Sequence, residues 1–328
     1  MILVTGAAGF IGSNLVAALD ARGGGGIAVC DRLGGDDKWR NLARRALAHV
    51  VAPEGLFDFL DGNRGNIETV FHMGAISSTT ETDVDLIIEV NVRLSARLWD
   101  WCAANGVPFI YASSAATYGG GEAGFDDDNA PEALARLRPL NPYGWSKHLF
   151  DRQVARLVAE GKPTPPHWAG LKFFNVYGPN EYHKGGQQSV VPQIYEQATH
   201  GGMARLFKSH HPDFEDGGQM RDFIWVGDCV DVMLWLADNS GANGIFNCGT
   251  GTARSFLDLA HAVFAALDRA PNIHYIPTPE NIRDKYQYFT EARMQRLRAA
   301  GYNAEFTSLE DGVSRYVADY LAADDPFL

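Results

Sequence analysis

Short apolar runs alternate with stretches of helical periodicity along the first half of the chain. Ile11, Leu15 and Leu19 recur at helical spacing directly after the first apolar run. Strands are predicted at 2–4, 27–30, 70–73 and 109–112, and a long helix at about 83–105. This alternation predicts an α/β fold built on a doubly wound parallel sheet.

The second half continues the alternation less regularly. A strand at 170–174 ends in a turn that leaves the sheet. The apolar stretch at 223–226 and the apolar helix that continues to about residue 237 are interpreted as a return to it. No linker-like segment separates the two halves. We expect a larger domain and a smaller interleaved α/β lobe, formed by 1–174 plus about 222–265 and by 175–221 plus about 266–328.

Composition narrows the class of protein. The formal net charge of -12 argues against nucleic-acid binding, because phosphate backbones require basic surfaces. No apolar run approaches the roughly 20 residues of a membrane span, and the first strand starts too early for a signal peptide. The four cysteines lack the spacing of a metal or disulfide framework, which indicates buried free thiols. We expect a cytoplasmic protein with no metal site.

The glycine-rich stretch after the first strand predicts a dinucleotide site. Gly6, Gly9 and Gly12 allow the backbone to approach a pyrophosphate, and the helix that follows offers free N–H groups at Phe10 and Ile11. Asp31 follows the second strand, where an acid binds the adenosine ribose of NAD. Arg32 and Lys38 follow and would hold a 2′-phosphate, so we favour NADP and keep NAD open.

Tyr143 and Lys147 lie four residues apart, which places them on one face of a helix. The lysine cation and a positively charged nicotinamide ring would favour the phenolate, making the tyrosine a base for a sugar alcohol. Lowering the pKa of Tyr143 by about 3 units needs roughly 4 kcal/mol of stabilisation of the phenolate relative to the phenol. Ser114 lies at the C-terminal end of the strand predicted at 109–112, just beyond its last residue, at the edge where parallel sheets bind ligands.

The ordered motifs at 6–12, 113–119, 143–147 and 174–179 resemble the extended short-chain dehydrogenase/reductase superfamily, in its nucleotide-sugar epimerase branch with a Rossmann-type sheet. Within it, the stretches at 77–81, 183–185 and 297–302 resemble the ADP-L-glycero-D-manno-heptose 6-epimerases. The resemblance implies inversion of C6″ of ADP-heptose through a transient 6″-ketone, for lipopolysaccharide core synthesis. It also implies tightly bound NADP and a homo-oligomer, expected to be a pentamer.

An epimerase must return hydride to the opposite face of a carbon, so one base serves only half of the reaction. Lys184, in a polar loop, is the candidate for the second acid/base group, and the resemblance implies the same role. Tyr143, Lys147, Ser114 and Lys184 form the expected catalytic set. The implied cofactor site adds Met73, Gly74, Ala75, Ile76, Ser77, Asn91 and Val176 to the residues above, with Tyr143, Lys147 and Lys184 shared. The implied substrate site comprises Ser78, Ser114, Asn175, Gly186, Gln193, Phe207, Lys208, Ser209, His210, Arg221 and Tyr286.

Two alternatives stay open. One is another nucleotide-sugar epimerase, such as a UDP-hexose 4-epimerase, and the other is a non-catalytic NADP-sensing protein of the same fold. A 4,6-dehydratase is disfavoured, because Ala115 and Ala116 stand where that reaction needs an acidic pair. Lys172, Gly186 and Gln193 depart from the family pattern, where an arginine, a serine and a histidine are usual.

Overall fold

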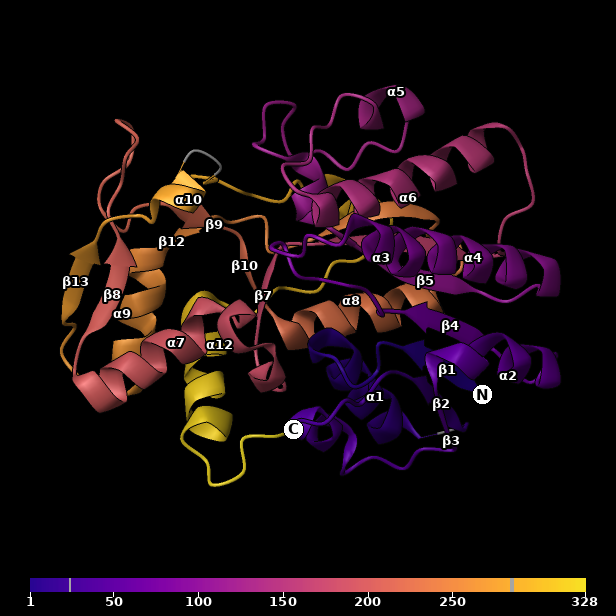
Figure 1. Cartoon of the computed structure of the whole chain (residues 1–328), viewed down its shortest axis with the longest axis horizontal. Helices are drawn as coiled ribbons and strands as arrows, with labels where there is room; N and C mark the ends of the chain where they lie inside the picture. Colours follow the sequence, from indigo (N-terminus) through magenta and orange to yellow (C-terminus); the bar gives the residue numbers. More distant parts are fainter. Residues whose placement is uncertain (24, 284–285) are drawn as a thin grey trace.

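The computed structural model describes residues 1–23, 25–283 and 286–328 (Figure 1). A seven-stranded sheet forms its centre, and every neighbouring pair of strands is parallel. Its strands, in spatial order, are β11 (Gly244–Cys248), β6 (Trp168–Phe173), β5 (Phe109–Ser114), β4 (Thr69–His72), β1 (Ile2–Thr5), β2 (Ile27–Cys30) and β3 (His49–Val51). The order reverses between β1 and β4, as in doubly wound folds. The predicted fold class is confirmed.

Helices cover both faces of the sheet (Figure 1). On one face lie α1 (Phe10–Arg22) and α8 (Val226–Asp238), which pack against each other. On the other lie α3 (Val84–Ile88), the π-helical turn η3 (Glu89–Arg93), α4 (Leu94–Asn105) and α6 (Pro142–Ala159). The helix predicted at 83–105 is thus present, with a π-helical turn in its middle. The remaining elements of this part are η1 (Asp37–Leu42), η2 (Pro53–Gly55), α2 (Leu56–Gly62), η4 (Ala115–Tyr118) and α5 (Pro131–Leu134).

The start of α6 follows from its sequence. The Asn141 side chain accepts a hydrogen bond from Gly144 N at 2.8 Å, and Pro142 occupies the first turn, where its missing N–H costs nothing. This cap fixes the start of α6 at Pro142, one residue before Tyr143, at the carboxyl end of the sheet.

A second core lies beside the sheet, in the left half of Figure 1. Tyr177, Phe223, Leu259, Val313 and Tyr316 are among its buried side chains. Its helices are α7 (Val190–Glu196), η6 (Gln197–Gly201), α9 (Phe256–Ala266), α12 (Leu309–Tyr316) and η7 (Val317–Leu321). Its strand pairs are β7 (Asn175–Tyr177) with β10 (Phe223–Trp225), β9 (Met220–Arg221) with β12 (Arg254–Ser255), and β8 (Ala204–Phe207) with β13 (Ile273–Ile276). The segments η5 (Tyr182–Gln187), α10 (Glu280–Arg283) and α11 (Gln295–Ala299) complete the fold.

Two sequence expectations differ from this packing. The stretch at 223–226 does not return to the central sheet, because β10 pairs with β7 in a separate ladder; α8, which follows, does rejoin the main core. In addition, α9 contributes Leu259 and Phe264 to the second core, while Leu297 and Tyr302 belong to the first. The cores therefore do not follow the expected division near residue 265, since the side chains that face each core decide the packing.

None of the helices within the described ranges has the length and apolar character that crossing a bilayer requires. The four cysteines are buried and unpaired, as predicted.

Candidate functional site

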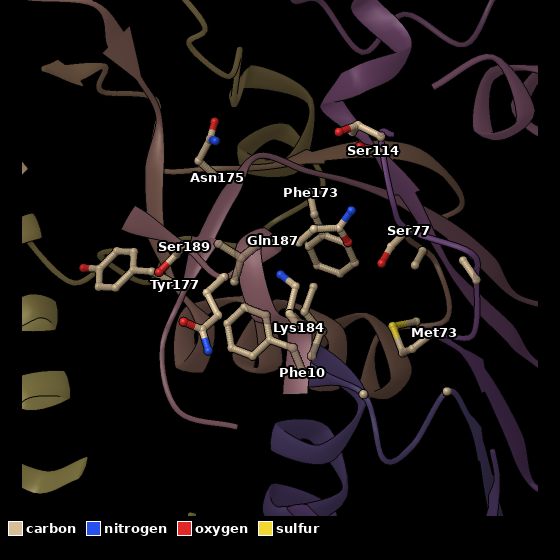
Figure 2. Close-up of a pocket in the computed structure, with 18 of the residues that line it drawn as sticks. Phe10, Met73, Ser77, Ser114, Phe173, Asn175, Tyr177, Lys184, Gln187 and Ser189 are labelled. Carbon is tan, nitrogen blue, oxygen red and sulfur yellow. The ribbon is translucent and has the colours of Figure 1, made fainter. Parts of the chain in front are cut away.

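A cavity of about 820 Å³ lies at the carboxyl ends of the central strands, where the strand order reverses (Figure 2). Predicted site residues that line it are Gly6, Gly9, Phe10, Ile11, Gly12, Asp31, Lys38, Met73, Gly74, Ala75, Ser77, Ser114, Tyr143, Lys147, Asn175, Val176, Lys184 and Gly186. Predicted residues outside its wall are Arg32, Ile76, Ser78, Asn91, Gln193, Phe207, Lys208, Ser209, His210, Arg221 and Tyr286. The chain thus brings most of the expected cofactor and catalytic residues into one cavity.

The glycine loop is packed so closely that side chains would not fit. Gly6 has a φ of +65°, and a Cβ there would lie 2.4 Å from Gly74 N. A Cβ on Gly12 would lie 2.2 Å from Gly6 O. Helix α1 starts just after Gly9 without a side-chain cap, so its first N–H groups point towards the cavity unpartnered by side chains. This cradle fits a pyrophosphate.

Two of the three charged residues predicted at the adenosine end come together. The Asp31 carboxylate accepts hydrogen bonds from Ala8 N at 2.8 Å and from Lys38 Nζ at 2.7 Å. Arg32 instead forms an ion pair with Glu54, and both side chains are largely exposed. Asp31 therefore braces the glycine loop, and Lys38 lines the cavity, whereas Arg32 pairs with Glu54 and does not line it.

Tyr143, the expected acid/base residue, has surroundings less favourable to a phenolate than predicted. Burial raises the pKa of the Tyr143 phenol, a hydrogen bond with Ser114 lowers it, and the Asp151 carboxylate raises it. The Lys147 ammonium donates to Ala112 O at 2.8 Å, and burial lowers its pKa to about 8. These neighbours alone therefore do not lower the pKa of Tyr143 as predicted. The geometric grouping of Tyr143, Lys147 and Ser114 at the cavity is as predicted.

A buried ion pair lies behind this group. Lys172 Nζ donates to the Asp151 carboxylate at 2.8 Å and to Thr117 Oγ1 at 2.6 Å. Both charged side chains are at most 1% exposed. Ser113 Oγ and Tyr111 OH also donate to Asp151, at 2.7 and 3.1 Å. Since α6 carries both Tyr143 and Asp151, this network ties α6 to β5 and β6.

Asn91 stabilises the loop that follows β4. Its Oδ1 accepts from Ile76 N at 2.8 Å, and its Nδ2 donates to Ile76 O at 2.9 Å. The π-helical turn η3 carries Asn91, which also donates to Ser146 Oγ at 3.0 Å. Asn91 is thus placed to shape the cavity wall at Met73 and Ser77 from behind, which explains why it does not line the cavity itself.

Lys184 enters the cavity from η5. Figure 2 shows its side chain extending from this segment towards the middle of the labelled group, and its Nζ lies 5.1 Å from the ring centroid of Phe10. Burial lowers the pKa of the Lys184 ammonium, and the Glu181 carboxylate partly raises it. A partly desolvated amine beside a buried carboxylate is suited to proton transfer.

The rest of this loop is held by side-chain amides. Gln187 Nε2 donates to Ser78 Oγ at 2.6 Å, which joins η5 to the loop after β4. Gln193 Nε2 donates to Gln188 O and Ser189 O at 3.0 and 3.3 Å, so it supports the loop backbone. Gly186 lies at the cavity, with open space where a Cβ would be.

The remaining predicted substrate residues form a second group in the smaller lobe. The Arg221 guanidinium lies 5.4 Å from the Tyr286 ring centroid and 5.5 Å from that of Phe256, which lines the cavity. Phe207 packs edge-to-face on Tyr286 at 6.1 Å. Lys208, Ser209 and His210 continue from β8, and His210 N donates to Tyr288 OH. Arg221 is 7% exposed and donates to Met220 O and Gln287 O.

Several cavity residues were missed by sequence reasoning. Phe173, Tyr177, Gln187, Gln188 and Ser189 line the wall without having been predicted. The last three immediately follow the predicted Lys184 loop, so extending that loop would have found them. Among the described residues, no group of three or more histidine, cysteine, aspartate or glutamate side chains could hold a metal ion.

Residues 2–249 match the NAD dependent epimerase/dehydratase family. A relative from Nitratidesulfovibrio vulgaris (strain DP4), named ADP-L-glycero-D-manno-heptose-6-epimerase, is 53% identical over 330 residues, with 100% of both chains covered. The structure of Helicobacter pylori ADP-L-glycero-D-manno-heptose-6-epimerase is similar with a TM-score of 0.79 and 25% identity, covering 98% of this chain and 96% of that one. UDP-glucose 4-epimerase of Thermus thermophilus, in complex with NAD, is similar with a TM-score of 0.74 and 27% identity, covering 98% and 99%. This chain belongs to the NAD dependent epimerase/dehydratase family, in the branch of the ADP-L-glycero-D-manno-heptose-6-epimerases.

Proposed function

We propose that this protein is an isomerase that inverts C6″ of ADP-D-glycero-β-D-manno-heptose to give ADP-L-glycero-β-D-manno-heptose. The observation that carries the proposal is the 53% identity, over the whole chain, to a relative of that name. The cavity supports it, because Tyr143 from α6 and Lys184 from η5 reach the same space from different elements.

Two acid/base groups meet the geometric need of an inversion. When bound, the nicotinamide ring supplies a reversible acceptor for the hydride of the sugar carbon. Tyr143 or Lys184 removes the hydroxyl proton in one orientation of the sugar. After the 6″-ketone has rotated to present its opposite face, the other group returns a proton to the oxygen. Ser114 would hydrogen-bond the reacting oxygen, and Lys147 would hold the nicotinamide ribose. A positively charged nicotinamide beside Tyr143 would lower its pKa, against the effect of burial.

The same cavity favours NADP as the resident cofactor. The unpartnered N–H groups after Gly9 would hold the pyrophosphate, and Lys38 would hold the 2′-phosphate. Since Lys38 already neutralises Asp31, the carboxylate would not repel that phosphate. We expect Lys38→Ala to weaken NADP⁺ binding about tenfold or more while NAD⁺ binding changes little, as measured by calorimetry. Equal losses for both dinucleotides would instead support NAD.

An NMR time course of the purified protein with ADP-D-glycero-β-D-manno-heptose, without added cofactor, tests the reaction. Inversion at C6″ would establish substrate, chemistry and a retained cofactor together. Tyr143→Phe is the matched control, because it removes one hydroxyl and keeps the ring. No inversion after adding NADP⁺, together with turnover of a UDP-hexose, would overturn the proposal in favour of a 4-epimerase.

Assembly and compartment complete the proposal. We expect a cytoplasmic homo-oligomer, specifically a pentamer, on the strength of the family resemblance. Analytical ultracentrifugation of the purified protein would show a single species of five subunits. A monomer across the micromolar range would contradict this part without affecting the proposed reaction.

A further inference from the structure

The segment formed by residues 325–328 lies against the cofactor-binding half of the molecule. In Figure 1 the yellow end of the chain returns to the indigo region around α1. The Asp325 carboxylate accepts hydrogen bonds from Arg44 Nη2 at 2.7 Å and from Arg40 Nη2 at 3.3 Å. Arg40 belongs to η1, the same short helix that carries Lys38. The 325–328 segment is thus joined to the adenosine end of the cavity.

Phe327 reinforces this attachment with apolar contact. Its side chain is buried, with 7% exposed, although residues 322–325 are exposed. The Arg40 guanidinium lies over its ring at 4.1 Å, and the Tyr182 ring packs edge-to-face on it at 5.3 Å. Arg44 Nη1 also donates to Phe327 O at 3.0 Å. Phe327 is therefore held between η1 and the first residue of η5.

The opposite side of the 325–328 segment is bonded to η5 and the turn before it. Tyr182 OH donates to Pro326 O at 2.9 Å, and Leu328 N donates to Asn180 Oδ1 at 3.0 Å. Asn180 is buried and has a φ of +71°, a conformation that needs support from its surroundings. Lys184 follows four residues later, so these bonds fix the base of the loop that carries it.

Asn41 links the same two elements to the glycine loop. Its Nδ2 donates to Ala8 O at 2.8 Å and to Asn180 O at 3.1 Å. The contacts therefore run from the 325–328 segment through η1 and Asn180 to the backbone that cradles the pyrophosphate.

We propose that the 325–328 segment is a positioning element for the cofactor site: it clasps η1 against η5, and so holds Lys38 and Lys184 at the two parts of the cavity that they line. This inference rests on the proposed function for the roles of the two lysines. The clasp itself rests only on the contacts described above. Asp325 and Phe327 are positioning residues, since neither lines the cavity.

The test measures how fast fluorescent NADPH dissociates from the full-length protein when it is chased with excess NADP⁺, and NADH is treated in the same way with NAD⁺. Phe327→Ala should raise the dissociation rate about tenfold, which corresponds to about 1.4 kcal/mol. Asp325→Asn should raise it about threefold, because its ion pairs are partly exposed. Phe327→Tyr keeps the ring and should restore a rate near that of the unchanged protein.

Hydrogen exchange separates positioning from a general loss of stability. In Phe327→Ala, exchange should accelerate at 37–42 and 182–187 while the central strands keep their protection. Asp324→Asn is the matched control, because Asp324 is the exposed neighbour and forms no ion pair within the described ranges. It should leave both dissociation and exchange unchanged.

Dissociation of both dinucleotides within twofold of the unchanged protein in Phe327→Ala would overturn the proposal. So would an equal effect of Asp324→Asn and Asp325→Asn, which would indicate a general charge effect. Neither readout requires the heptose, so failure of the proposed reaction and failure of the clasp are seen in different experiments. Asp325→Asn alters only the partly exposed contacts with Arg40 and Arg44, and therefore keeps the test valid if Phe327→Ala does not fold.

Discussion

Replacing Lys172 by methionine should destabilise the protein strongly. The substitution keeps most of the side-chain volume but removes the cation that faces Asp151. The carboxylate is fully buried, and among the described residues only Ser113 Oγ and Tyr111 OH would still donate to it. Leaving one member of a buried ion pair without its partner costs about 3–5 kcal/mol. We expect the free energy of unfolding to fall within that range, towards its lower end because two hydroxyl donors stay in place.

Urea unfolding of Lys172→Met beside Lys162→Met measures this cost. Lys162 is exposed, so the same chemical change there should alter the free energy of unfolding by less than about 0.5 kcal/mol. Adding Asp151→Asn to Lys172→Met removes the orphaned charge and should recover a large part of the loss. A coupling energy of at least about 2 kcal/mol between the two positions is expected.

The same variant should also slow catalysis. Thr117 Oγ1 accepts a hydrogen bond from Lys172 Nζ and donates one to Ser114 O at 2.8 Å. Without the lysine, the turn that follows Ser114 is held less firmly. Turnover should drop while bound cofactor is retained, because Lys172 does not line the cavity. A loss of unfolding free energy below about 1 kcal/mol, or the same loss in the double variant, would refute the reasoning that the pair is a single buried unit.

Three further substitutions test other parts of the site. Tyr143→Phe should reduce turnover about 10²–10⁴-fold and leave dinucleotide binding intact, as single-turnover kinetics and cofactor content would show; unchanged turnover would exclude Tyr143 as the acid/base group. Gly12→Ala should weaken dinucleotide binding at least about tenfold in calorimetry, because its Cβ would overlap Gly6 O, whereas Gly55→Ala, with open space around it, should not. Burial lowers the pKa of His72 to about 3, so below its ordinary value of 6.5 the unfolded chain binds a proton that the folded protein does not. Because of this group, the free energy of unfolding should fall by about 2 kcal/mol between pH 7 and pH 5, and in His72→Gln it should fall by correspondingly less. Parallel pH profiles of the unfolding free energy in the two proteins would contradict the assignment.

Local motifs were predictable from the sequence. The glycine loop, the strand–helix alternation and the spacing of Tyr143 and Lys147 each depend on a few neighbouring residues, and the structure has them where the sequence indicated.

Features that depend on distant partners were not predictable. Nothing near Arg32 in the sequence indicates that it pairs with Glu54 and does not line the cavity. The pKa of Tyr143 is raised because burial outweighs the hydrogen bond from its neighbour, and burial is set by the whole fold. The attachment of Asp325 to Arg40 and Arg44 joins distant parts of the chain, since Arg44 and Asp325 are 281 positions apart. Neither composition nor periodicity carries information about such pairs.

The two buried cores have a consequence for how the molecule can be divided. The chain passes from one core to the other several times: Phe174 and Ile224 lie in the first, Tyr177 and Phe223 in the second, and Leu297 is again in the first. No single cut separates the sequence into two contiguous pieces that each retain a complete core. Expression of either half alone should therefore give an unfolded product, and the two walls of the cavity should be lost together in one cooperative transition.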